Sequence, residues 1–195
     1  MEIRAGETRI VLADGVNARY FDPFEKLPEK HQLLLAFEDS SFVVCTIQMY
    51  GVLYAFTEGE NNNPYYHVSK EKPSPLSKEF NREYFEKIIS AVKPTLSVKA
   101  LLATEQRIPG FGNGVLQDIL FVCGINPKTK IQFLDTSEKN NLFNNIKKLL
   151  DQMSKNGGRD TEKDLFGNYG SYKTILSAKT YKKPCPVCGN SVVKQ

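Results

Sequence analysis

The sequence predicts an α+β protein, with strands in the first third of the chain and helices after it. Short runs of apolar and β-branched residues, separated by turn signals, fill residues 8–56. From residue 80 onward, the apolar residues recur instead at the spacing of one helix face. The stiff connector Lys72-Pro73-Ser74-Pro75 lies between these two patterns, so we expect domains at residues 1–71 and 72–158. After residue 158 the helical spacing is lost, and residues 159–195 are expected to form a tail.

Four strands are expected in the first domain. The run at residues 8–12 is rich in β-branched side chains and is followed by Asp14-Gly15, a turn signal. The runs at 32–37 and 42–47 are separated only by a short polar stretch, which predicts a hairpin. The expected strands are Thr8–Leu12, Gln32–Phe37, Phe42–Ile47 and Val52–Phe56.

Four helices are expected in the second domain, with apolar faces at residues 80–89, 98–102, 115–120 and 142–153. Pro94 ends the first of them, and Ser97 is the expected N-cap of the second. The longest helix is expected to be capped by Thr136 or Ser137 and to be ended by Gly157-Gly158.

Charge and composition restrict the possible functions. The net charge of +4 is weak evidence alone, but the segment from Lys173 to Gln195 holds five lysines and no acidic residue. Such a tail suits a polyanionic partner, and a solvated terminus explains it equally well. No apolar run approaches the length of a membrane span, and the first residues lack a signal-peptide pattern, so we expect a cytoplasmic protein. Cys45 and Cys123 lie in apolar runs and are expected in the core.

The segment Gln106–Pro127 contains a glycine-rich turn between two expected helices. Gly110 and Gly112 allow a positive φ and the close approach of another backbone. Asn113, at the start of the second helix, is placed either to cap it or to donate its amide outward. Beside the free N–H groups of a helix start, an outward amide would bind a phosphate oxygen. The alternative is a plain corner between helices with Asn113 as its cap, and the turn alone favours that alternative.

This segment resembles the helix–two-turn–helix motif of the formamidopyrimidine-DNA glycosylase/endonuclease VIII family. The stretch from Ser97 to Leu102 resembles a family segment with a lysine and a double leucine, and Pro75-Leu76-Ser77 resembles the connector that opens its helical domain. The resemblance extends from about residue 8 to residue 190. The positions that fall on the motif are Gly110, Gly112, Asn113, Asp118, Leu120, Gly124, Ile125 and Pro127.

The resemblance implies that the partner is double-stranded DNA containing a damaged or abasic nucleotide. In the family, an asparagine and a lysine at the positions of Asn113 and Lys99 hold the DNA backbone beside the lesion. Phosphate contacts of this kind position the duplex without reading its sequence. Gly110 and Gly112 would form the turn against the phosphate, and Arg159 and the tail lysines would extend the positive surface.

Family enzymes also flip the damaged nucleotide out of the stack and fill the gap with wedge residues. The family's Arg-Phe-Gly loop aligns with Met49-Tyr50-Gly51. The resemblance therefore implies that Tyr50 stacks as a wedge, although Met49 stands where the family has an arginine. A strand-end aromatic that covers the core is the competing interpretation of Tyr50.

The resemblance sharpens the fold prediction to a partial antiparallel β-sandwich, a helix–two-turn–helix domain and half of a zinc ribbon. Cys185 and Cys188 form one CxxC knuckle, and a structural zinc site needs two knuckles. We therefore expect zinc to bind weakly, or only between two chains. A thioredoxin-like redox role is disfavoured, because the motif lies in a Lys/Pro/Gly-rich tail.

The family's nucleophile is an N-terminal proline followed by a glutamate, and here Glu2 and Ile3 follow Met1. No residue is therefore assigned a catalytic role, and we expect no glycosylase or lyase activity from the chain alone. Truncation of a full glycosylase at both ends is the favoured explanation. The alternatives are a short non-catalytic DNA-binding paralogue and a helical protein-interaction domain unrelated to repair.

Overall fold

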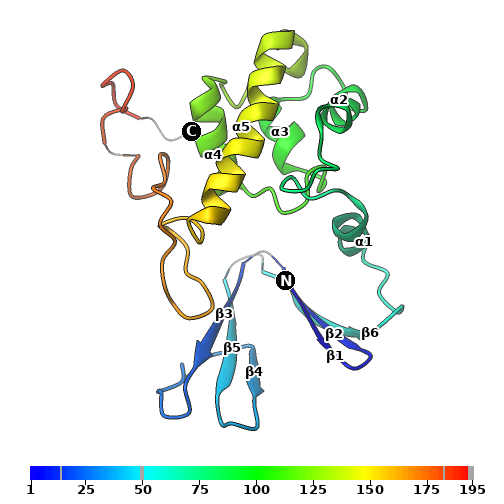
Figure 1. The fold of residues 1–195 in the computed structure, drawn as a ribbon, viewed down its shortest axis with the longest axis vertical. Helices are drawn as coiled ribbons and strands as arrows, with labels where there is room; N and C mark the ends of the chain where they lie inside the picture. The colour runs from blue at the N-terminus through cyan, green and yellow to red at the C-terminus, as the bar shows by residue number, and fades with distance from the viewer. Residues whose placement is uncertain (14, 49–50, 182, 193–195) are drawn as a thin grey trace. The chain divides into compact units, whose positions relative to one another are not determined.

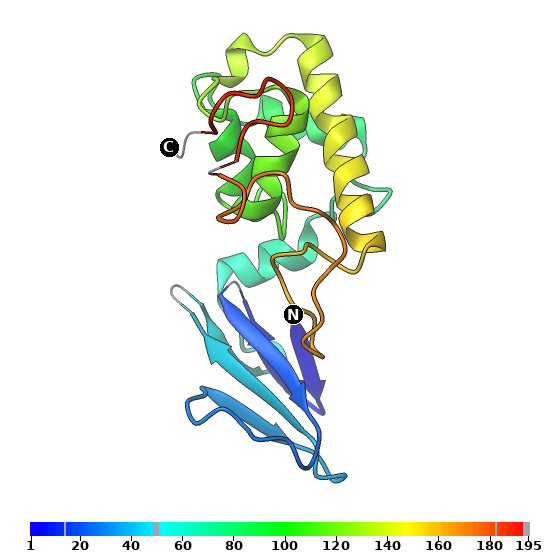
Figure 2. The ribbon, with the colours of Figure 1, turned by 90° about the vertical axis from the view of Figure 1, so that its left-hand side faces the viewer.

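The computed structural model of the protein describes residues 1–13, 15–48, 51–181 and 183–192. The chain forms two compact units, one of Met1–Asn63 with Glu162–Gly170, the other of Pro64–Thr161 with Ser171–Gln195 (Figures 1 and 2). Strands make up the first and helices the second, in agreement with the expected α+β class. The division falls at residue 64 rather than 72, because the segment after the last strand folds as a helix of the second unit.

The first unit contains two antiparallel three-stranded sheets that share one apolar cluster. The cluster is centred on Leu12, Val43 and Cys45, which are buried. Side chains from both sheets pack against it. The sheets have the strand orders β1-β2-β6 and β3-β5-β4, formed by β1 (Glu2–Ala5), β2 (Thr8–Leu12), β3 (Val16–Phe21), β4 (Leu33–Ala36), β5 (Phe42–Ile47) and β6 (Leu53–Thr57).

All four expected strands are present, and the expected hairpin is the β4–β5 pair. Two further strands, β1 and β3, were not expected. Each lies at the edge of its sheet, and polar side chains alternate with apolar ones along β3. Polar residues interrupt both strands, so neither contains the apolar run by which the other four were recognised.

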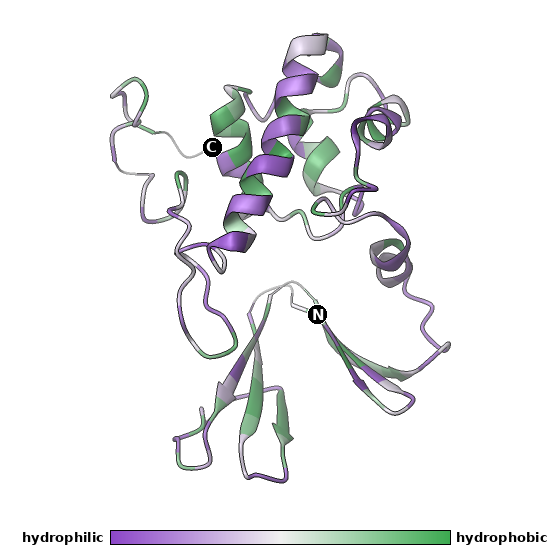
Figure 3. Cartoon of the chain, in the orientation of Figure 1, coloured by the Kyte–Doolittle hydropathy of each residue, from purple (hydrophilic) through white to green (hydrophobic). Residues whose placement is uncertain are grey.

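The second unit is a set of helices around one core. Its helices are α1 (Pro64–Glu71), α2 (Arg82–Ser90), α3 (Val98–Ala103), α4 (Asn113–Cys123), a 3₁₀ turn η1 (Ile131–Phe133) and α5 (Thr136–Lys155). Phe80, Phe85, Leu120, Leu142 and Ile146 lie in the centre of the core and are fully buried. Figure 3 shows apolar residues recurring along α5, as the 3.6-residue period requires. Among the described residues, no helix combines the length and apolar character needed to cross a bilayer.

The four expected helices correspond to α2, α3, α4 and α5, and α1 was not expected because none of its residues is buried. Ser97 caps α3 as expected, since its side chain accepts a hydrogen bond from the Ala100 amide (3.2 Å). The expected cap of α5, Thr136 or Ser137, is wrong. Asp135 caps this helix in a reciprocal capping box with Glu138, which satisfies two amides at once.

Candidate nucleic-acid interface

The turn between α3 and α4 presents a helix N-terminus without a cap. Gly110 adopts the expected left-handed conformation (φ 72°), and Gly112 occupies the N-cap position of α4. A glycine cannot cap with its side chain, and no side-chain cap hydrogen bond is made at this helix start among the described residues. Within the part of the chain that the structure describes, no hydrogen bond uses the N–H groups of Asn113, Gly114 or Val115. These groups, with the positive end of the helix dipole, form a site for an anion.

Asn113 is the first residue of α4 and does not cap it. Its φ and ψ belong to the helix, and the N-cap is one residue earlier. The side chain is exposed, and no hydrogen bond of its amide occurs among the described residues. The alternative of a plain capping asparagine is therefore wrong. The amide stands at a helix start with its donor available to an external acceptor.

Gly112 adopts an ordinary extended conformation (φ −85°, ψ 164°) that any residue accepts, so the expectation of a positive φ here is wrong. A Cβ at this position would meet no atom within 4 Å. The fold thus gives no reason for a glycine at residue 112. A reason comes instead from ligand access, because a side chain at residue 112 would stand in the way of an anion that approaches the first amides of α4.

Lys99 lies in the first turn of α3, and its side chain is exposed. The described residues provide its ammonium group with no ion pair or hydrogen bond. The backbone fixes its position relative to α4, since the Lys99 amide donates to the carbonyl of Pro127 (3.1 Å), just beyond the end of that helix. The neighbouring Val98 amide donates to Thr129 (2.9 Å). Two backbone hydrogen bonds therefore join the start of α3 to the segment after α4.

Arg159 is not on the exposed surface where the sequence led us to expect it. It is buried, with 7% of its surface accessible, and its guanidinium group lies against Gly114 in the first turn of α4. A Cβ on Gly114 would collide with the Nη1 atom. Arg159 therefore packs behind the turn as a structural element. Sequence alone gave no signal of this contact, because 45 residues separate the partners.

Asp118, the acidic position of the motif, has a structural role that the sequence did not indicate. It is fully buried in α4 and accepts hydrogen bonds from the amides of Ile175 (3.0 Å) and Leu176 (2.8 Å). The pKa of nearby Tyr172 rises to about 12, because burial and the Asp118 carboxylate both disfavour the phenolate. The carboxylate thus holds the segment after Arg159 against the helix that begins at Asn113.

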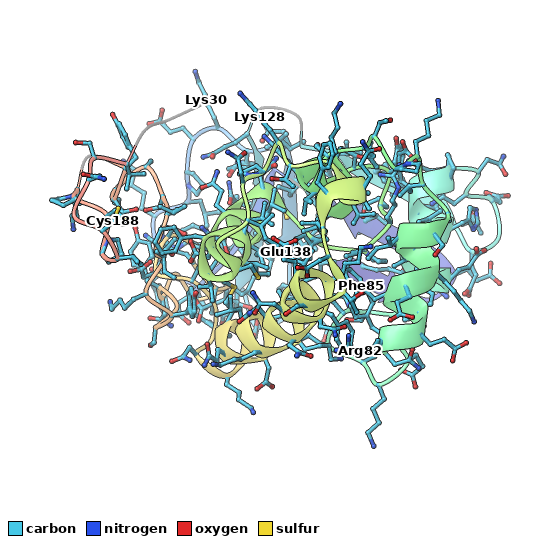
Figure 4. All side chains as sticks on the ribbon, turned by 90° about the horizontal axis from the view of Figure 1, so that it is seen from above. Lys30, Arg82, Phe85, Lys128, Glu138 and Cys188 are labelled. Atoms are coloured by element: carbon cyan, nitrogen blue, oxygen red, sulfur yellow. The ribbon has the colours of Figure 1, made fainter. Side chains whose placement is uncertain are left out.

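The CxxC segment forms a tight turn on the tail, and Figure 4 places Cys188 at the outer edge of the helical unit. The Cys185 amide donates to Asn190 (2.7 Å) and the Gly189 amide to Cys185 (2.9 Å). Hydrogen bonds from the amides of Cys188 and Val187 lower the pKa of the Cys185 thiol. Two thiolates supply half of a tetrahedral zinc site. No group of three or more metal-binding side chains occurs among the described residues, so the donors present do not complete one.

Two further expectations from the sequence concern the wedge residue and the lysines of the tail. Tyr50, the expected wedge, and Met49 beside it lie outside the described residues. In the tail, Lys173 is exposed and stands 3.8 Å from Asp160.

Comparison with curated proteins identifies relatives that share one name. No protein-family model matches the chain. Formamidopyrimidine-DNA glycosylase of Legionella pneumophila (strain Lens) is 33% identical over 138 residues, which are 68% of this chain and 49% of that protein. The same enzyme of Prochlorococcus marinus (strain NATL1A) is 32% identical over 131 residues, or 66% and 46%. The chain spans about half the length of these curated relatives.

Solved structures agree in fold. The MutM (Fpg) protein of Thermus thermophilus matches with a TM-score of 0.76 at 20% identity, over 95% of this chain and 70% of that one. Lactococcus lactis Fpg, in complex with DNA containing an abasic site, matches with a TM-score of 0.74 at 20% identity, over 96% and 73%. At such identities the likeness shows the fold.

Proposed function

Because the chain belongs to the formamidopyrimidine-DNA glycosylase family, we propose that it binds double-stranded DNA containing a damaged or abasic nucleotide. One observation carries the proposal: the uncapped start of α4, where three free amides and the Asn113 side chain offer donors to a single anion. A phosphate oxygen beside the lesion is the acceptor that fits this geometry.

Each residue of the turn has a distinct role in this proposal. Asn113 donates its side-chain amide to a phosphate, and Gly112 leaves room for the DNA backbone. Gly110 gives the turn its left-handed step. Lys99, on α3, places a positive charge beside the same DNA strand. Arg159 supports the turn from behind instead of contacting DNA, which departs from our expectation from sequence.

The biological role that we propose is base-excision repair, in which oxidised bases are removed from DNA and the abasic site is cleaved. The names of the curated relatives describe a DNA glycosylase, and this chain spans about half of each. In the same proposal the two sheets of the first unit are part of a β-sandwich, and Tyr50 is a wedge at the lesion. Cys185 and Cys188 are two ligands of a zinc ribbon whose other ligands come from outside the described residues.

Binding measurements on matched variants test the proposal. The probe is a duplex with one abasic-site analogue, followed by fluorescence anisotropy over a series of salt concentrations. Asn113→Ala removes a hydrogen bond to a charged group, so affinity is expected to fall roughly tenfold. Lys99→Ala removes one phosphate contact, so the slope of log K against log salt is expected to fall by about 0.9.

Two control variants remove the same groups elsewhere in the helical unit. Gln117→Ala deletes an exposed amide from α4, and Lys148→Ala deletes an exposed lysine from α5. Both are expected to bind as the parent chain does. If Asn113→Ala and Lys99→Ala bind no more weakly than these controls, while all four chains are folded, the proposed function fails.

A further inference from the structure

A groove in the helical unit, apart from the Asn113 turn, carries a concentration of positive charge. It has a volume of about 690 Å³ and lies between α2 and the segment that joins α3 to α4. Its lining includes four cationic side chains and one carboxylate, with apolar residues of α2 as a wall. The charged residues are Lys72, Lys87, Lys93, Arg107 and Glu105.

Three of the cations remain available to a ligand. Lys93 is exposed, and its ammonium group has no ion pair or hydrogen bond among the described residues. Lys87 pairs only with Glu83 (2.8 Å), and both side chains are more than 70% exposed, so the pair contributes little. Lys72 donates one hydrogen bond, to the Gln106 carbonyl (3.2 Å), and an ammonium group has two further donors.

The wall opposite α2 has a strained but fixed backbone. Glu105 and Gln106 both adopt left-handed conformations, with φ of 57° and 47°. Consecutive left-handed residues other than glycine are costly and persist where the surroundings hold them. Here Arg107 contacts both sides of the turn, because its Nη1 donates to Thr104 Oγ1 (2.8 Å) and to the Ala100 carbonyl (3.0 Å), and its Nη2 pairs with Glu105 (2.6 Å). These contacts join this wall of the groove to α3.

The groove also adjoins the proposed interface. Arg107 is hydrogen-bonded to α3 at Ala100, the residue after Lys99, and its own chain segment continues directly into the Gly110–Asn113 turn. One lining residue of the groove is thus bonded to the helix that carries Lys99, and the chain leads from this residue into the turn at Asn113. A DNA strand presents phosphates along its length, with sugar carbon atoms between them that suit an apolar wall.

We infer that this groove binds the phosphate backbone of the DNA strand that continues from the lesion, with Lys87 and Lys93 as its main contacts. The inference rests on the proposed function, because the Asn113 turn must hold the lesion for the strand to extend here. It adds a second contact region that only a duplex of sufficient length reaches.

Duplex length separates the two regions. We compare abasic-site duplexes of about 10 base pairs, one helical turn, and about 20 base pairs. The double variant Lys87→Ala/Lys93→Ala is expected to lose about tenfold in affinity for the long duplex and to lower its salt slope by about 1 to 2 units. Its affinity for the short duplex is expected to stay unchanged. The control Lys148→Ala/Lys155→Ala removes equal charge from exposed positions of α5, where Lys155 pairs with Asp151 as Lys87 does with Glu83, and is expected to affect neither duplex.

A second variant moves affinity in the opposite direction. Glu83→Gln removes the carboxylate that pairs with Lys87, so binding of the long duplex is expected to strengthen about two- to threefold. This result also shows that the fold is intact, which loss of binding alone does not.

Three outcomes would overturn the inference. The double variant could bind both lengths like its control while Asn113→Ala still weakens binding, which leaves the proposed function standing. It could lose affinity equally for both lengths, which indicates a general charge effect. Finally, inorganic phosphate or polyglutamate could shift the amide resonances of residues 87–93 where the long duplex does not, which assigns the groove to a small anion or an acidic protein. If Asn113→Ala has no effect either, the proposed function itself fails.

Discussion

The guanidinium group of Arg159 lies against Gly114, in the space that a β-carbon at residue 114 would occupy. This contact joins the segment after α5 to the first turn of α4, directly beside Asn113. The consequence is that the chain after α5 supports the proposed phosphate-binding turn from behind. A change on either side of the contact is therefore expected to disturb the turn.

Gly114→Ala is expected to destabilise the protein, even though alanine is the better helix former by about 1 kcal/mol. The added methyl group forces Arg159 out of its site, and overpacking of this kind costs about 1–3 kcal/mol. Urea denaturation measures the free energy of unfolding. Arg159→Ala provides the matched background, because Gly114→Ala should stabilise the helix there once the guanidinium group no longer occupies the space of the methyl group. An equal loss of stability from Gly114→Ala in both backgrounds would contradict the contact.

Asp118→Asn is expected to loosen the segment that follows Arg159. The carboxylate accepts two backbone hydrogen bonds, and an asparagine amide offers one acceptor and turns a donor toward the other N–H group. The expected cost is about 1–3 kcal/mol. Hydrogen exchange at Ile175 and Leu176 should become faster, with the core of α5 unaffected. Unchanged protection at both amides would show that Asp118 does not hold this segment.

Gly112→Ser is expected to change stability and DNA affinity in opposite directions. The backbone at residue 112 already has N-cap geometry, so a serine hydroxyl would accept a hydrogen bond from the first turn of α4. The cap stabilises the helix by a few tenths of a kcal/mol. The capped amide can no longer bind the phosphate, and the serine side chain obstructs the approach of the phosphate. Thermal unfolding and anisotropy on the same sample measure both effects. A more stable variant with full affinity would contradict the proposed contact.

Because the pKa of Tyr172 is raised, the protein is expected to lose stability at high pH. Its pKa in the folded protein is about 12, above the ordinary value of 10, because of burial and the nearby Asp118 carboxylate. Below pH 10 the phenol is protonated in both the folded and the unfolded protein, so its contribution to the free energy of unfolding is fully present. Between pH 10 and 12 the unfolded chain loses the proton first, and the free energy of unfolding falls.

Tyr172→Phe is expected to remove this part of the pH dependence, whereas Tyr65→Phe, at an exposed position, is expected to keep it. Urea unfolding at four pH values between 9 and 12 provides the comparison. The same decline in all three proteins would assign the effect to other groups.

The sequence predicted four strands and the helices α2 to α5 well, because burial imposes a period on apolar residues. It placed Asn113 at the mouth of a helix, but could not distinguish a cap from an outward donor. That distinction depends on whether the helix begins at Asn113 or one residue later, and the sequence does not determine a helix boundary to one residue. The burial of Arg159 was missed for another reason: an arginine after a Gly-Gly pair resembles a surface residue until the fold brings Gly114 beside it.

Titration of the ¹⁵N-labelled chain with an abasic-site duplex tests the proposed phosphate contact most directly. We expect the backbone amides of Asn113, Gly114 and Val115 and the side-chain amide of Asn113 to shift first and furthest, while Gln117 on the same helix changes little. The shifts of the three backbone amides should shrink in Gly112→Ser. Binding that leaves these amides unchanged and shifts resonances elsewhere would contradict a phosphate contact at the start of α4.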